Sequence, residues 1–131
     1  MIPVFDGHND FLLRLCDNPG QRQAIWQGKG GGWHLDLSRI KAGGFVGGFF
    51  AVFVPSPPDQ GVADLDKVMQ NPPYAAPLRA AVTHEEAVAA AMAMVGHGPW
   101  LERTGDLSIC RTAGEICAAA WPSGPPRLQS A

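Results

Sequence analysis

One run of the sequence, residues 45–54 (FVGGFFAVFV), is apolar at every position apart from two glycines, and it limits the folds open to the chain. Valine and phenylalanine favour strands, and a continuous apolar run is typical of a strand buried on both faces of a parallel sheet. Pro55, Pro57 and Pro58 end the run abruptly, because proline supplies no backbone N–H donor. The sequence therefore predicts a strand with structure packed on both of its faces.

A second apolar run, residues 2–9 (IPVFDGHN), predicts an earlier strand. Residues 11–16 are typical of a short helix, and residues 17–20 (DNPG) of the turn that closes it. Residues 21–33 are polar and then rich in glycine, so we expect a loop there. This loop lacks the Gly-Lys-Ser/Thr ending of a phosphate-binding loop, which makes a nucleotide site a weak interpretation.

Residues 34–44 predict a helix that leads into the long apolar run. Asp36 or Ser38 can cap its start, and Gly43 is placed to adopt the left-handed conformation at its end. Because strand, helix and strand alternate along the chain, the sequence indicates the α/β class.

The second half of the chain contains two helix starts with the capping-box spacing. After a proline-rich stretch that we expect to be irregular (residues 55–82), Thr83 and Glu86 open a helix that continues through residues 87–95. Thr112 and Glu115 repeat the spacing and open a last helix. That helix ends after about two turns, where the sequence becomes WPSGPP. Between the two helices, residues 107–110 (LSIC) predict a short strand.

Composition excludes several classes of protein. A chain of 131 residues suffices for one domain, and a net charge of -2 gives no reason to expect nucleic acid or an acidic membrane surface as a partner. Three cysteines without a CxxC spacing argue against a disulfide framework and a structural zinc site. With no N-terminal targeting pattern and no apolar segment of membrane-spanning length, we expect a soluble, cytoplasmic protein.

The strongest chemical signal is a histidine and an aspartate two residues apart, His8 and Asp10, at the end of the first predicted strand. Side chains at positions i and i+2 of a strand point to the same face, so an imidazole and a carboxylate would lie side by side. Active sites of parallel α/β folds form at this carboxyl edge, and the pair suits zinc, manganese or iron. In the alternative interpretation, Asp10 caps the following helix and His8 hydrogen-bonds to it.

Asp6 shares the same face by the period of two, and three roles for it remain open: a third ligand, a partner that holds the imidazole, or an acceptor of backbone hydrogen bonds. His34, His84 and His97 are interpreted as surface residues. The cysteines lack the basic neighbours that activate a thiolate. The remaining acids of interest are interpreted as first-turn or surface residues: Glu85, Glu86, Glu102 and Glu115.

Three segments together resemble the membrane (renal-type) dipeptidase family, zinc metallopeptidases with an amidohydrolase-like barrel. The segments are FDGHND at residues 5–10, HLDLSRIKAGG at 34–44 and VGGFFAVFVP at 46–55. Their order and spacing are similar to the family over roughly residues 3–116, which is a far more specific signal than the His8–Asp10 spacing alone.

The resemblance implies a (β/α)8 barrel of the TIM type in which two zinc ions are bridged by a carboxylate. A metal-bound hydroxide then hydrolyses the peptide bond of a dipeptide. Carried over to this sequence, His8 and Asp10 are ligands of one zinc. The bridging glutamate, the other ligands and the substrate-binding residues of the family find no match here, so no catalytic or substrate-binding residue is identified.

The resemblance also predicts a boundary within the last helix. Residues 1–116 match the first part of a dipeptidase barrel, whereas residues 117–131 match nothing in it, and we expect a frameshifted or disordered tail in a truncated chain. A barrel of this type has eight strands in typically about 250 residues, and only two strands are convincing here.

Three functions remain open at this point. The first is a zinc-dependent dipeptidase, a hydrolase whose substrate is a dipeptide, present as an N-terminal part. The second is a catalytically inactive barrel fragment with at most one weak metal site, because two protein ligands are fewer than a catalytic zinc requires. The third is an interaction module that uses uncovered apolar strand faces, with an oligomer as one form of it.

Overall fold

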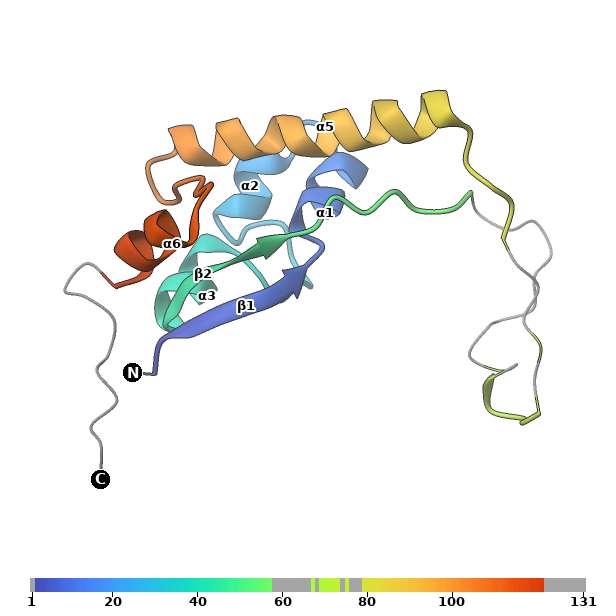
Figure 1. Ribbon diagram of the computed structural model, residues 1–131, viewed down its shortest axis with the longest axis horizontal. Helices are drawn as coiled ribbons and strands as arrows, with labels where there is room; N and C mark the ends of the chain where they lie inside the picture. Colours follow the sequence, from blue (N-terminus) through green and yellow to red (C-terminus); the bar gives the residue numbers. More distant parts are fainter. Residues whose placement is uncertain (1, 58–66, 68, 74, 76–78, 122–131) are drawn as a thin grey trace.

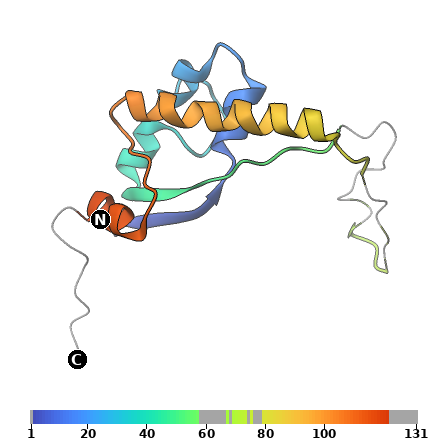
Figure 2. The same ribbon diagram turned by 45° about the horizontal axis from the view of Figure 1, so that its top comes forward.

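Two parallel strands, β1 (Val4–Asn9) and β2 (Phe45–Phe50), lie side by side in the computed structural model. The structure describes residues 2–57, 67, 69–73, 75 and 79–121. Helices α1, α2 and α5 lie on one side of the strand pair, and α6 contacts β2 (Figure 1, Figure 2). The observed class is α/β, as the alternation of strand and helix predicted.

The strands approach each other closely at two glycines of β2. Phe5 pairs with Gly47 and Asp6 with Gly48. A Cβ atom at Gly47 would lie 2.9 Å from the Phe5 ring, and one at Gly48 would lie 2.9 Å from the Cβ of Asp6. The two glycines that interrupt the apolar run are therefore required for the pairing.

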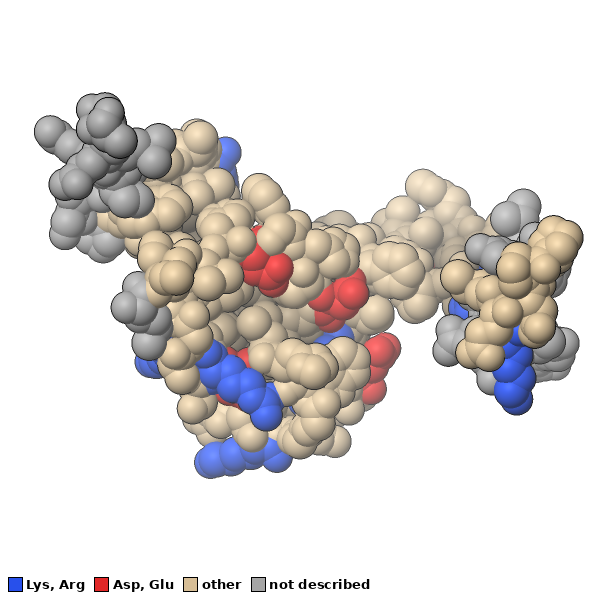
Figure 3. Space-filling model, turned by 90° about the horizontal axis from the view of Figure 1, so that it is seen from below, with Lys and Arg blue, Asp and Glu red and all other residues tan. Residues whose placement is uncertain are grey.

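The prediction that residues 45–54 form one strand buried on both faces is wrong for the described residues. β2 ends at Phe50, and Phe49 is 59% exposed while Phe50 packs against the core. Successive strand side chains point to opposite faces, and the helices cover only one of them. Seen from the side away from α5, most of the described surface carries neither acidic nor basic side chains (Figure 3).

The core lies between the strands and the helices on their covered side. It joins α1 (Phe11–Asp17), α2 (Arg22–Trp26), α3 (Leu37–Ala42) and α5 (His84–Arg103). Its buried members are Phe11, Leu12, Leu15, Ile25, Trp26, Ile40, Met94 and Leu101. Aromatic rings tie it to β2, since Phe11 contacts both Trp26 and Phe50.

Helix α2 falls inside a segment that we expected to be a loop. Ile25 and Trp26 are 2% and 1% exposed, and their burial on the core side stabilises a short helix that the polar and glycine-rich surroundings do not favour. The prediction of a loop over residues 21–33 is therefore wrong for its first part and holds from Gln27 onward.

Helix α3 begins and ends close to the predicted positions. The Asp36 carboxylate, and not the Ser38 hydroxyl, caps it by accepting from the Arg39 N–H at 2.9 Å. Gly43 remains in the right-handed region, and the left-handed conformation falls on the next residue, Gly44, at φ 70°. The predicted left-handed position was thus wrong by one residue.

The two capping boxes are confirmed. Thr83 and Glu86 open α5, and Thr112 and Glu115 open α6 (Ala113–Ala120). Helix α5 continues beyond the predicted end at residue 95 because Met94 and Leu101, two turns apart on one face, are both buried.

Residues 107–110 do not form the predicted strand. The Ile109 N–H donates to the Glu102 carboxylate at 2.9 Å, so a side chain of α5 takes the donor that a neighbouring strand would have used.

Two earlier predictions concern residues that lie partly outside the described ones. Half of the proline-rich stretch, residues 55–82, lies outside them, and so do residues 122–131 of the predicted tail. The boundary between residues 116 and 117 stays a prediction. Among the described residues, no helix has the length and apolar character needed to cross a membrane.

The capping box of α5 gives a first prediction. Thr83→Ala removes the hydroxyl that accepts from the Glu86 N–H, so we expect the free energy of unfolding to fall by about 1 kcal/mol. Thr83→Ser keeps the hydroxyl and should keep most of the stability. Urea unfolding followed by helical circular dichroism measures both, and an equal loss in the two variants would contradict the capping interpretation.

Candidate metal centre

His8 and Asp10 lie where β1 passes into α1. The His8 Nε2 and Asp10 Oδ1 atoms are 3.3 Å apart, and the two side chains are 67% and 47% exposed. The predicted juxtaposition of the imidazole and the carboxylate is therefore observed, at the carboxyl end of a parallel strand. Both side chains are open to solvent and to a ligand.

Asp10 occupies the N-cap position of α1, yet its carboxylate makes no capping hydrogen bond to the described part of that helix. Asn9 takes part of this role, because its Oδ1 accepts from the Phe11 N–H at 3.3 Å. The first half of the alternative interpretation, Asp10 as a helix cap, is therefore wrong. Its second half, a contact between His8 and Asp10, is observed at 3.3 Å.

Asp6 stabilises the strand end rather than adding a ligand. Its Oδ1 accepts from the His8 backbone N–H at 3.1 Å, and its Oδ2 accepts from the Asn9 side-chain amide at 3.0 Å. The same Asn9 amide also donates to the Phe49 carbonyl of β2 at 3.4 Å. Of the three roles open to Asp6, the structure supports the acceptor of backbone and amide hydrogen bonds.

The donor set fits a zinc ion in chemistry but not in number. An imidazole nitrogen and a carboxylate oxygen are ordinary zinc ligands, and catalytic zinc sites take three protein ligands. Within residues 2–57 and the other described segments, no group of three His, Cys, Asp or Glu side chains is placed to hold a metal ion. His8 and Asp10 thus form a two-ligand site.

A cavity of about 190 Å³ opens beside Asp10. One wall comes from the end of β1 and the start of α1, and the other comes from the loop that precedes α3. The lining residues are Asn9, Asp10, Phe11, Arg14, Trp33, His34 and Leu35. His34 is exposed, as expected of a surface residue, but it shares this cavity with Asp10.

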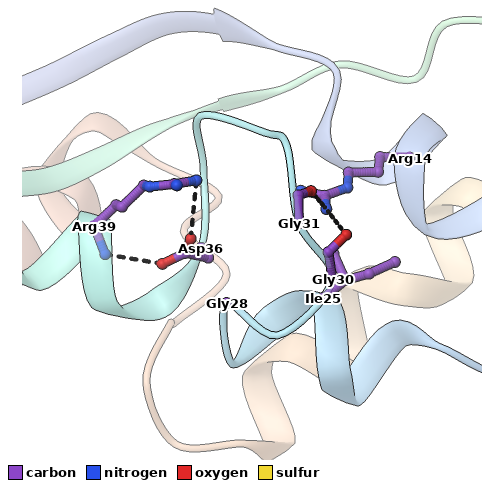
Figure 4. A pocket seen from close by; sticks show the side chains of 7 residues that line it. All are labelled: Arg14, Ile25, Gly28, Gly30, Gly31, Asp36 and Arg39. Carbon is purple, nitrogen blue, oxygen red and sulfur yellow. Dashed lines mark hydrogen bonds and ion pairs between the residues drawn. The ribbon is translucent and has the colours of Figure 1, made fainter.

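Arg14 holds the loop that forms the second wall of the cavity. It is only 5% exposed, and its Nη2 donates to the carbonyls of Gly30 and Gly31 at 3.3 and 3.0 Å, contacts drawn in Figure 4. Its guanidinium carbon also lies 5.0 Å from the centre of the Trp33 ring. Burial lowers the pKa of Arg14, and the nearby Asp36 carboxylate opposes that shift.

Gly30 allows this contact, since a Cβ there would lie 2.8 Å from Ile25 and 3.2 Å from the Arg14 guanidinium. Asp36 lines a smaller cavity of about 20 Å³ on the other side of the loop (Figure 4). Its Oδ2 lies 3.2 Å from the Arg39 guanidinium. The hydrogen bond from the backbone N–H of Arg39 is the main reason why the pKa of the Asp36 carboxyl is lowered. Burial of the carboxyl opposes this shift.

No family model matches the chain. One solved structure, dipeptidase AC, a metallopeptidase of peptidase family M19, is 48% identical with a TM-score of 0.79 over 92% of this chain. Over 92% of its length, the chain is therefore similar to metallopeptidases of this family. The resemblance predicted from the sequence is thereby confirmed.

A second relative is the metallopeptidase from Rhodobacter sphaeroides, solved with a phosphinate mimic of the dipeptide L-Ala-D-Ala. It is 48% identical over 92% of this chain, with a TM-score of 0.80. An uncharacterised protein in the PQQ-III 3′ region of Acinetobacter calcoaceticus is 52% identical over 56 residues, which are 41% of this chain and 18% of that protein. The chain spans 34% and 35% of the two solved structures.

The other predicted site residues lie apart from the metal pair. His84 is exposed in the first turn of α5, as expected. His97 is half-buried, contrary to its interpretation as a surface residue, and burial followed by the Arg22 charge lowers its pKa. Burial and the neighbouring Asp17 raise the pKa of Cys16, which agrees with an unactivated thiol.

The Arg14 contact leads to a stability prediction. Arg14→Met keeps the aliphatic stem but removes two charge-assisted hydrogen bonds, so we expect a loss of about 2 kcal/mol in the free energy of unfolding. The matched control is Arg22→Met, because Arg22 lies 4.9 Å from the Trp100 ring and should cost about 0.5–1 kcal/mol. Equal losses in urea unfolding would show that the carbonyl contacts contribute nothing of their own.

Asp36 leads to a prediction about acid stability. Because its folded pKa is depressed below 3.8, its charge stabilises the fold above that pH, and this contribution disappears as the pH falls through the folded pKa. Asp36→Asn should therefore be less stable than the parent at neutral pH, and the difference should shrink in acid. Urea unfolding across that pH range measures it, and a difference that stays constant with pH would contradict the assignment.

Proposed function

We propose that this chain supplies the first ligands of the metal centre of a zinc-dependent dipeptidase, with His8 and Asp10 holding one zinc ion. The observation that carries the proposal is the 3.3 Å separation of the His8 Nε2 and Asp10 Oδ1 atoms at the carboxyl end of β1. Both relatives with solved structures are metallopeptidases, and one was solved with a mimic of a dipeptide. A dipeptide is accordingly the proposed substrate.

Each residue around the pair has a distinct part in this proposal. His8 would bind through a neutral imidazole nitrogen, and Asp10 would supply a carboxylate oxygen. Asp6 and Asn9 hold the backbone that carries both ligands, through hydrogen bonds of 3.1 and 3.0 Å. Bound zinc supplies Lewis-acid chemistry, polarising a carbonyl and lowering the pKa of water.

We also propose that β1 and β2 are neighbouring strands of a (β/α)8 barrel. Two observations support it: the strands are parallel with helices on one side only, and Phe49 on the other side is 59% exposed. In such a barrel the uncovered side faces inward, and the carboxyl ends of the strands carry the active site.

The second candidate is a chain that binds one metal ion weakly and is inactive as a dipeptidase without further ligands. The observation in its favour is the ligand count, since the described residues bring only His8 and Asp10 together. The two candidates share the same metal pair. They differ in whether the 131-residue chain turns over a dipeptide.

Zinc titration of the purified chain tests the proposal. We expect His8→Ala and Asp10→Asn each to weaken zinc binding by about tenfold or more, because each removes half of the two-ligand set. His84→Ala is the matched control, since His84 is exposed in α5 and should leave binding unchanged. Zinc binding that survives both ligand substitutions would overturn the proposed metal site.

A dipeptide hydrolysis assay on the same samples separates the two candidates. With two ligands, we expect no turnover by the chain alone, which is the result that the second candidate requires. Turnover that rises in proportion to bound zinc and is lost in His8→Ala would exclude the inactive form and support the complete enzyme.

A further inference from the structure

The cavity beside Asp10 is lined by both polar and apolar side chains. Asn9 and the proposed zinc ligand Asp10 come from the end of β1 and the turn that follows it, and Arg14 and His34 are the other polar members. The apolar side chains come from two segments of the chain: Phe11, Trp33 and Leu35. At about 190 Å³ the cavity is smaller than pockets that enclose a whole drug-sized ligand, roughly 300–1,000 Å³, so it suits one side chain of a small substrate.

Trp33 lies at the cavity with about half of its surface exposed to solvent. Its side chain is 52% exposed, although an indole of this size ordinarily contributes to stability by being buried. The Arg14 guanidinium lies 5.0 Å from the ring centre and also binds the carbonyls of Gly30 and Gly31. Arg14 itself is 5% exposed, so the residue that contacts the Trp33 ring is buried in the fold.

The backbone of the loop is shaped for this presentation. Gly31 and Gly32 have φ values of 62° and 70°, a region that other residues rarely adopt. The two glycines directly precede Trp33 and turn the chain so that Trp33, His34 and Leu35 reach the cavity. Because Arg14 also holds this loop, binding of a ligand costs less ordering than it would in a loop without such contacts.

Arg14 is poorly suited to bind an anionic group in the cavity. Its Nη2 already donates to two carbonyls, and the Asp36 carboxylate opposes the loss of its charge. The apolar side chains of Phe11, Trp33 and Leu35 therefore favour an uncharged, apolar group as the occupant.

We propose that Trp33 and Leu35 form a subsite that receives an apolar side chain of the dipeptide beside the metal centre, with Arg14 as the positioning residue of the loop. The identity of the ligand rests on the proposed function, whereas the apolar preference rests on the cavity walls. Trp33 is then a specificity-determining residue. A glycine at the corresponding position of the dipeptide would leave the subsite empty.

Nuclear magnetic resonance of the ¹⁵N-labelled full chain with zinc tests this subsite. Leucylglycine and glycylglycine share termini and peptide bond and differ only in one isobutyl side chain. We expect the amides of Phe11 and Leu35 to report binding of leucylglycine about tenfold tighter than that of glycylglycine. Equal dissociation constants for the two dipeptides would overturn the proposal.

Three variants locate the preference. Trp33→Ala should bring the two dissociation constants to within about twofold of each other, and Trp33→Phe, which keeps an aromatic wall, should retain most of the difference. Phe53→Ala is the matched control, because Phe53 is also 52% exposed but is no part of the cavity lining, and it should change nothing. A preference that survives in Trp33→Ala would overturn the assignment to Trp33.

The same spectra keep the two proposals apart. Zinc should shift the amides of His8 and Asp10, and their failure to shift would overturn the metal site. If these amides do not shift, the dissociation constants of the two dipeptides are measured at the amides of Phe11 and Leu35 in samples without zinc. A preference there would support the apolar subsite without the metal, and its absence would overturn the subsite as well.

Discussion

The close approach of β2 to β1 is the constraint on which the rest of the structure depends. Gly47 and Gly48 leave no side chain in the space taken by Phe5 and Asp6, so the strands pair in the register that places Asn9 beside Phe50. That register brings the Asn9 amide to the Phe49 carbonyl. The end of β1 carries the candidate metal ligands. This side-chain hydrogen bond holds it to β2 in addition to the backbone pairing of the two strands.

The metal pair and the cavity beside it depend on two separate supports. Asp6 and Asn9 hold the turn that carries His8, through hydrogen bonds within three residues of sequence. The Trp33 loop is held by Arg14, which reaches across 16 residues to Gly30. Local contacts thus place the ligands, and a tertiary contact places the wall opposite them. One solved relative is named a dipeptidase and the other was solved with a mimic of a dipeptide. In this chain the two supports meet at the same cavity.

An element could be predicted from the sequence when the residues that stabilise it lie close together in the sequence. The sequence predicted the capping residues Thr83, Thr112 and Asp36 because each of them contacts a residue only three positions away. Helix α2 was missed because it depends on burial of Ile25 and Trp26 against distant helices, which no local pattern records. The strand expected at residues 107–110 failed for a related reason, since the Glu102 side chain takes its donor at Ile109.

The sequence by itself determined the α/β class and the resemblance to metallodipeptidases. It also determined the pairing of His8 with Asp10, because a strand places side chains two residues apart on one face. Only the structure showed that Asp6 holds the backbone by local hydrogen bonds and that the Asp10 carboxylate makes no capping hydrogen bond. The cavity that His34 and Trp33 share with Asp10 is a tertiary feature, because it depends on how a glycine-rich loop folds back over α1. Its path is set by a buried arginine and two carbonyls that no spacing in the sequence links.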